Sequence, residues 1–204
     1  MKIICIAWNY VDHTKELDNT IPPNPVFFIK PDTALLRNNQ PFFYPDFTKN
    51  LHYETELVIR INKVGRSIEE KFAHRYYYEV GIGIDLTARD IQQECRKNAQ
   101  PWAIAKAFDF SAPLSPTFTP LEQLGGLSNI SFHMDLNGVT VQKGNSSDMI
   151  FSVDKIISYI SQFMTLKIGD LIFTGTPAGV GPLKIGDRLQ AYIEDKLLLD
   201  FEIK

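Results

Sequence analysis

The segment from residue 52 to residue 62, HYETELVIRIN, places two carboxylates at the start of a run that must be buried. Its side chains alternate along the segment, which is typical of a β-strand. Glu54 and Glu56 are two residues apart, so they share one face of that strand. Two buried carboxylates need a cation, protons or a basic partner. The alternative is that the pair marks a solvent-facing end of the strand.

The length and composition are those of one globular domain. The chain has 204 residues, of which 44% are hydrophobic, and this is enough to bury a sizeable core. Acidic residues outnumber basic residues by 24 to 21 and the formal net charge is -3. Basic residues are also scattered, so we expect no nucleic-acid surface.

Cysteine usage and the N-terminal sequence indicate the compartment. Cys5 and Cys95 have neither the number nor the spacing of a disulfide framework or a zinc site. The apolar run MKIICIAW is shorter than the ~7–15 residues expected of a signal peptide core. No stretch approaches the ~20 apolar residues of a membrane span. We therefore expect a cytoplasmic protein with no membrane partner.

Short strands outnumber helices in the predicted secondary structure. Runs of β-branched and aromatic residues predict strands at 3–7, 26–30 and 76–86. Asn137-Gly138 is typical of the tight turn of a β-hairpin. We therefore expect an α+β, mainly β domain.

Capping residues predict where helices begin, and a capping-box pattern at Ser67 and Glu70 indicates one such start. Ser152 is a suitable N-cap for a helix over 153–164, whose apolar residues fall on one stripe. Thr87 resembles the N-cap of another helix over 88–98.

A third acid follows two glycines in VGIGIDL. Gly81, Gly83 and Asp85 are expected on one face of their strand. Glycine inside a strand often marks close approach by a ligand or by another backbone, and tight packing is the alternative. With Glu54 and Glu56, Asp85 would complete three oxygen ligands. Such a set suits Mg²⁺, Mn²⁺ or Ca²⁺ rather than zinc.

Three further side chains could serve chemistry beside such an ion. Lys106 is the only charge in the apolar run 101–108, where it is either a surface lysine or a cation that neutralises an oxyanion. His13 and Glu16 have the spacing that brings side chains together on a helical turn, and a carboxylate beside a histidine makes a general base. A polar loop is the alternative for that segment.

A glycine-rich loop, TGTPAGVG, spans 174–181. It lacks the lysine of a phosphate-binding loop and does not match the dinucleotide motif. Its threonine hydroxyl and backbone N–H groups could instead hold a substrate carboxylate.

Together these motifs resemble the fumarylacetoacetate hydrolase family, in particular its small acylpyruvase and oxaloacetate decarboxylase branch. The resemblance runs along nearly the whole chain through NYVDHTKE, FIKP, HYETEL, GIGIDLTARDIQ, PWAIAKAFD, GNSSDMIFS and GDLIFTGTPAGVGP. The order of these pieces is far more specific than any one of them. The branch usually has Gly-Arg before Asn9-Tyr10, where this chain has Ala7-Trp8.

The resemblance implies roles for nine residues. It implies Mg²⁺, or alternatively Mn²⁺ or Ca²⁺, on three ligands: Glu54, Glu56 and Asp85. It implies a catalytic set that contains a dyad on a lid and a lysine beside the ligand oxygens: His13, Glu16 and Lys106. It implies substrate-binding residues: Arg89, Gln92 and Thr176.

The resemblance also implies a fold and an activity. The fold is a mixed β-roll of layered sheets as in the fumarylacetoacetate hydrolase C-terminal domain, usually dimeric, over 1–204, with N-terminal strands and a lid in 1–45. The activity is metal-dependent C–C cleavage of acylpyruvates or decarboxylation of oxaloacetate. Isomerisation of 2-hydroxyhepta-2,4-diene-1,7-dioate and keto–enol tautomerisation of oxaloacetate are alternatives with the same metal–enolate core. A metal-dependent dicarboxylate binder is the non-enzymatic alternative.

Overall fold

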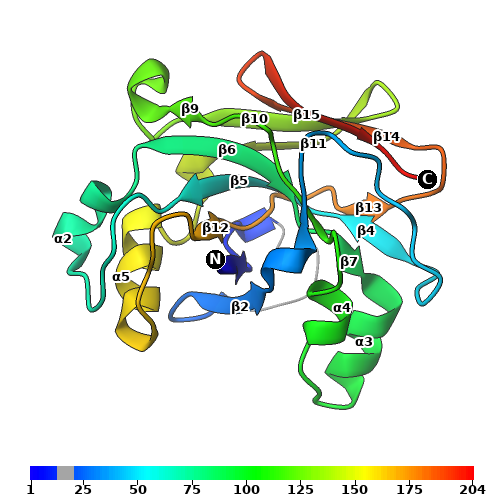
Figure 1. Cartoon of the computed structure of the whole chain (residues 1–204), viewed down its shortest axis with the longest axis horizontal. Coiled ribbons are helices and arrows are strands. Elements are labelled where there is room, and N and C mark those ends of the chain that lie inside the picture. Colours follow the sequence, from blue (N-terminus) through cyan, green and yellow to red (C-terminus); the bar gives the residue numbers. More distant parts are fainter. Residues whose placement is uncertain (13–20) are drawn as a thin grey trace.

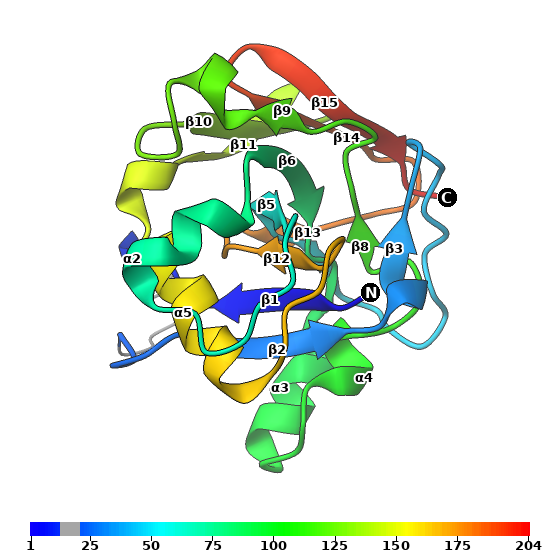
Figure 2. The same ribbon diagram turned by 60° about the vertical axis from the view of Figure 1, so that its left-hand side comes forward.

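The computed structural model describes residues 1–12 and 21–204. Within these ranges strands dominate, and they form one large mixed sheet, one antiparallel sheet and two small sheets. The antiparallel sheet lies over strands β5 and β6 of the large sheet, while the short helices α3 and α4 lie on the opposite side (Figures 1 and 2). The predicted mainly β, layered architecture is therefore confirmed.

The large sheet has six strands and carries the site. Their order is β2 (Val26–Lys30), β1 (Ile3–Ala7), β12 (Leu171–Phe173), β5 (Thr55–Arg60), β6 (Glu79–Ile84) and β9 (Thr119–Pro120). Strands β1 and β12 are parallel, and the other neighbours are antiparallel. The predicted strands at 3–7 and 26–30 are confirmed, and the one predicted at 76–86 is shorter.

The antiparallel sheet is built from two hairpins. Its order is β11 (Val139–Asn145), β10 (Ser131–Leu136), β14 (Arg188–Ile193) and β15 (Lys196–Glu202). The turn between β10 and β11 is Asn137-Gly138, as predicted, and both residues have positive φ, 54° and 79°. Such backbone angles match a type I′ turn, whose twist suits two adjacent strands.

The remaining strands are short. A three-stranded sheet contains β13 (Gly181–Pro182), β4 (Leu51–Tyr53) and β7 (Thr87–Ala88), and a parallel pair contains β3 (Leu35–Leu36) and β8 (Ala112–Pro113). Strands β4 and β7 matter for function because they lead into β5 and the helix α3.

Both faces of β5 are buried, which explains why its sequence is apolar on both sides. Leu57 and Ile59 belong to the main hydrophobic core, whereas Val58 belongs to a second cluster with Phe173 of β12. The carboxylate that shares the Val58 face is Glu56, and it is buried as well. The acids are therefore interior groups and not a solvent-facing strand end.

The α-helices with bounds inside residues 21–204 are α2 (Glu70–Ala73), α3 (Arg89–Lys97), α4 (Ala103–Lys106) and α5 (Val153–Phe163). Ser152 caps α5 as predicted, because its side chain accepts a hydrogen bond from the Lys155 N–H. No helix among the residues the structure describes is long and apolar enough to cross a membrane.

The cap predicted at Thr87 is wrong. Thr87 lies in strand β7 opposite His52, and the N-cap position of α3 is Ala88. The Thr87 hydroxyl donates to the Asp85 carbonyl oxygen instead of capping the helix. Pairing with β4 thus overrides the local preference of threonine for a cap.

The two glycines of β6 clear space for protein side chains. A Cβ atom at Gly83 would lie 2.6 Å from the Phe173 ring and 3.0 Å from the Pro113 carbonyl oxygen, and one at Gly81 would meet Ser115 and Phe118. Of the two explanations for these glycines, the structure supports tight packing.

Replacing Gly83 by alanine is expected to lower the free energy of unfolding by about 1–3 kcal/mol, because the new methyl group overlaps a packed aromatic ring. Urea denaturation measures the loss. In a double-mutant cycle, Phe173→Leu should relieve part of the overlap and give a favourable coupling energy. A neutral Gly83→Ala variant would contradict the packing explanation.

Candidate metal centre

Strand pairing brings the three predicted ligands together. Thr55 of β5 lies opposite Ile84 of β6, and the pairing continues when the Asp85 N–H donates to the Glu54 carbonyl oxygen at 2.8 Å. Glu54 and Asp85 are therefore neighbours across the strand ends, and Glu56 is two residues further along β5. One carboxylate oxygen from each acid lies within 4.8 Å of the others, and all three residues are buried.

Lys106 binds two of these acids at once. Its Nζ lies 2.8 Å from Glu54 Oε2, 2.7 Å from Asp85 Oδ2 and 2.6 Å from Thr87 Oγ1, so its three donors have three acceptors. Burial alone would lower the pKa of Lys106, but the Asp85 and Glu54 carboxylates outweigh it and hold the pKa above the ordinary lysine value. Lys106 is a fixed positive charge beside the ligand oxygens and not a surface lysine.

Two more cations complete the charge balance. Lys30, at the end of β2, is fully buried, and its Nζ lies 2.7 Å from Asp85 Oδ1. Arg89, at the start of α3, donates from Nη2 to Glu54 Oε1 at 2.6 Å. Three buried carboxylates therefore face three buried cations.

Glu56 is the exception within this balance. Its Oε2 accepts a hydrogen bond from the Gly175 N–H at 2.6 Å, but within the described part of the chain no cation forms an ion pair with it. Burial raises its pKa well above the ordinary glutamate value, and the charges of Asp85 and Glu54 raise it further. Glu56 is thus the ligand that most lacks a positive partner.

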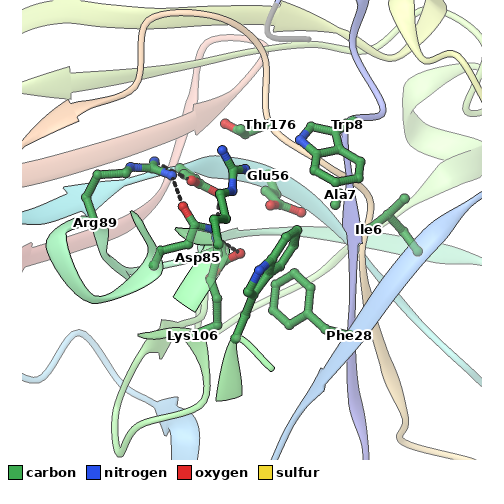
Figure 3. Close-up of a pocket in the computed structure, with 13 residues that line it drawn as sticks. Ile6, Ala7, Trp8, Phe28, Glu56, Asp85, Arg89, Lys106 and Thr176 are labelled. Carbon is green, nitrogen blue, oxygen red and sulfur yellow. Dashed lines mark hydrogen bonds and ion pairs between the residues drawn. The ribbon is translucent and has the colours of Figure 1, made fainter. Parts of the chain in front are cut away.

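A cavity opens above the acids (Figure 3). The labelled side chains of Glu56, Asp85 and Lys106 converge at its floor, with Arg89 on one side and Trp8 on the other. The full lining is Ile6, Ala7, Trp8, Phe28, Glu54, Glu56, Asp85, Arg89, Gln92, Arg96, Trp102, Lys106 and Thr176. The cavity therefore has charged groups on its floor and aromatic groups in its wall.

The other predicted site residues fall into two groups. Arg89, Gln92 and Thr176 line the cavity, where Gln92 Oε1 accepts from Arg89 and the Thr176 hydroxyl accepts from Gln142. In the glycine-rich loop 174–181, the Gly175 N–H donates a hydrogen bond to a protein carboxylate, that of Glu56. The predicted dyad, His13 and Glu16, lies outside the described residues.

Sequence reasoning missed four residues of this site. Lys30 was present in the FIKP motif without a role, although a lysine at the end of a buried strand is a signal for an interior charge. Arg96, Trp8 and Trp102 were not expected in the lining, because α3, β1 and the segment before α4 meet only in three dimensions.

The donor set fits a hard divalent cation. All three groups are carboxylates, which are the ligands that Mg²⁺, Mn²⁺ and Ca²⁺ prefer. Each carboxylate oxygen has two lone pairs, so one that accepts a hydrogen bond can still bind an ion. No cation within the described residues pairs with Glu56, so its carboxylate is the one most available to an added ion.

Comparison with known proteins gives the family. Residues 2–202 match the family model described as fumarylacetoacetate (FAA) hydrolase C-terminal. The mitochondrial oxaloacetate tautomerase FAHD1 of Bos taurus is 42% identical over 202 residues, which are 99% of this chain and 91% of the relative. The oxaloacetate tautomerase YcgM of Escherichia coli is 42% identical over 188 residues, 92% of this chain and 86% of the relative.

A solved structure extends the similarity to the fold. The fumarylpyruvate hydrolase of Pseudomonas aeruginosa, in complex with Mn²⁺ and pyruvate, superposes with a TM-score of 0.93 at 35% identity, covering 100% of this chain and 89% of the other. A layered β fold with a buried acidic cluster thus defines the class of protein. The chain belongs to the fumarylacetoacetate hydrolase family.

Glu54→Gln and Glu56→Gln should have opposite effects on the stability of the metal-free protein. Glu54→Gln leaves Arg89 and part of Lys106 uncompensated and is expected to lower the free energy of unfolding by up to about 3–5 kcal/mol. Glu56→Gln removes a buried charge that lacks a cation and is expected to raise it. Thermal unfolding measures both, and calorimetric titration with Mn²⁺ should show that both variants lose metal binding.

The pH dependence follows from the same charge. Because the folded state holds the Glu56 proton more tightly than the unfolded state, the metal-free protein should lose stability as pH rises above about 4.3, the ordinary glutamate value. This loss should be smaller in Glu56→Gln than in the unaltered protein. Identical pH profiles would contradict the assignment of Glu56 as the uncompensated acid.

Proposed function

We propose that the chain is an enzyme that binds Mg²⁺ or Mn²⁺ and interconverts the keto and enol forms of oxaloacetate or a similar 2-oxo dicarboxylate. The observation that carries the proposal is the balance of three buried carboxylates by three buried cations. A divalent ion added to this balanced set leaves two positive charges, which a doubly charged 2-oxo acid would neutralise. The tautomerase relatives, similar along almost the whole chain, support the same reaction.

Glu54, Glu56 and Asp85 would hold the ion. When bound, the ion would act as a Lewis acid that polarises the 2-oxo group of the substrate. Lys106, which contacts the carboxylates of Glu54 and Asp85, would place a second positive charge beside the ion. This charge would stabilise the negative charge that develops on the substrate oxygen as the enol forms. Arg89 and Gln92 fix one another through a 2.6 Å hydrogen bond and would orient the substrate carboxylate.

The proton transfer itself needs a base near the methylene carbon of the substrate. We assign this role to His13, held by Glu16, on their sequence spacing and on the family resemblance. The base would take a proton from carbon 3, and the 2-oxo oxygen would take up a proton to give the enol. In the reverse direction the enol oxygen loses its proton and the base returns one to carbon 3. Lys106 is unsuited to this role, because all three of its donors are committed to acceptors.

Hydrolysis of a C–C bond is the second candidate. The observation that favours it is the similarity to the fumarylpyruvate hydrolase that was solved with Mn²⁺ and pyruvate. In this reaction water, deprotonated by the same base, would attack the distal carbonyl of an acylpyruvate, and pyruvate would leave. The two candidates share the carboxylate cluster and differ in whether water attacks.

Rate measurements distinguish the candidates. With Mg²⁺ or Mn²⁺ present, we expect the protein to accelerate the loss of enol ultraviolet absorbance from freshly dissolved oxaloacetate. Pyruvate release from oxaloacetate and from acetylpyruvate, followed with a coupled dehydrogenase, should be far slower. Fast release from acetylpyruvate would favour the hydrolase, and tight oxalate binding with no turnover of any substrate would favour a dicarboxylate binder.

Replacing His13 by alanine should separate binding from chemistry. We expect the rate of tautomerisation to fall by about 10²–10⁴-fold, which is the usual contribution of general acid–base catalysis. The affinity for Mn²⁺ should be unchanged in a calorimetric titration, since no metal ligand is altered. A His13→Ala variant with full activity would overturn the assignment of the base.

A further inference from the structure

One face of α3 carries three polar side chains into the cavity. Arg89, Gln92 and Arg96 are spaced three and four residues apart, so they lie along one stripe of the helix. All three line the cavity. Arg89 and Gln92 are buried, whereas Arg96 is exposed and lies nearer to solvent. The stripe therefore runs from the acid cluster toward the cavity mouth.

The charge of Arg96 is not committed to a protein carboxylate. Within residues 1–12 and 21–204, the other cations of the lining each pair with an acid, but Arg96 has no ion pair or hydrogen bond to one. Partial burial and the like charge of Arg89 lower its pKa and outweigh the attraction of Glu54. A guanidinium at the wall of a cavity, without its own acid, can bind an anionic group.

Two tryptophans hold this guanidinium in position. The Arg96 Cζ atom lies 5.4 Å from the ring centre of Trp102 and 6.0 Å from that of Trp8, which are distances of cation–π contacts. The two rings pack edge to face with centres 5.6 Å apart. Trp8 and Trp102 are the two tryptophans of the chain. Aromatic walls restrict the orientation of the guanidinium without neutralising its charge.

The backbone at Trp8 is unfavourable. Its φ of 57° is in the left-handed region, which a bulky residue rarely adopts. Such conformations persist where surrounding contacts over-determine them, and they cluster at functional sites. In Figure 3 the Trp8 ring lies across the carboxylates from Arg89. This arrangement places the ring in the cavity wall, where it can contact Arg96.

We propose that Arg96 binds the distal carboxylate of the substrate and thereby selects 2-oxo dicarboxylates over 2-oxo monocarboxylates. This inference rests on the proposed function, in which the near carboxylate and the 2-oxo group bind at the acid cluster. A guanidinium offers two parallel N–H donors that match a carboxylate. Arg96 would determine specificity and would not take part in catalysis, because the proton transfer takes place at carbon 3 and the 2-oxo group and not at the distal carboxylate.

Ligand titrations that require no turnover test the proposal. Malate and 2-hydroxybutanoate share a carboxylate, a 2-hydroxyl group and chain length, and differ in that malate has a second carboxylate in place of a methyl group. Binding to the Mn²⁺-loaded protein is measured by calorimetry and by tryptophan fluorescence, because both tryptophans contact Arg96. Oxalate is too short to reach beyond the acid cluster, so its binding should report whether that site is intact.

The unaltered protein should bind malate about 10–100-fold more tightly than 2-hydroxybutanoate, the range expected for a hydrogen bond to a charged group. Arg96→Gln should remove this preference and leave the oxalate affinity unchanged, while Arg96→Lys should restore part of it. Lys97→Gln is the matched control, since it removes an exposed charge from the same helix outside the cavity lining.

The results of these titrations distinguish a failure of the role proposed for Arg96 from a failure of the proposed function. If oxalate and Mn²⁺ bind but Arg96→Gln keeps the preference for malate, or Lys97→Gln loses it equally, the role of Arg96 is overturned and the proposed function stands. If the unaltered protein binds neither oxalate nor malate in the presence of Mn²⁺, the proposed function fails at the acid cluster itself.

Discussion

The pairing of Lys106 with Glu54 and Asp85 is the interaction on which the site depends. It joins the C-terminal end of α4 to the ends of β5 and β6, three elements that are distant in sequence. A buried ammonium ion is tolerated only where acids compensate it, and buried acids are tolerated only where cations do the same. The positions of α4 and of the two strand ends are therefore coupled by charge as well as by packing.

Lys30 extends this coupling to the edge of the large sheet. Its ammonium group donates to the carbonyl oxygens of Ser111 and Lys106 while it pairs with Asp85, so it links β2 to the segment that carries Lys106. Among the three acids, Glu56 is the one that no cation of the described residues pairs with, and burial raises its pKa well above the ordinary glutamate value. If Glu56 holds an ion as proposed, stability and metal binding make opposite demands on it, as is common in functional sites.

The sequence predicted the strands and the carboxylate pair well, because alternation in a strand determines which residues share a face. That Asp85 joins Glu54 and Glu56 was expected from the ligand chemistry and from the family resemblance, whereas the pairing of β5 with β6 that brings them together is a long-range property. Gly83 was ambiguous for the same reason: the ring that fills its space belongs to Phe173, ninety residues later in the chain. Lys30 and Arg96 were missed because a charge acquires its role from partners that only the fold supplies.

A crystal structure of the protein with Mn²⁺ and oxalate, recorded so that the anomalous signal of manganese locates the ion, would show whether the three acids bind the metal. We expect a single strong anomalous peak in contact with carboxylate oxygens of Glu54, Glu56 and Asp85, with oxalate completing the coordination on the cavity side. Manganese bound elsewhere, or Glu54 and Asp85 that remain paired only with Lys106, Lys30 and Arg89 at saturating Mn²⁺, would contradict this assignment.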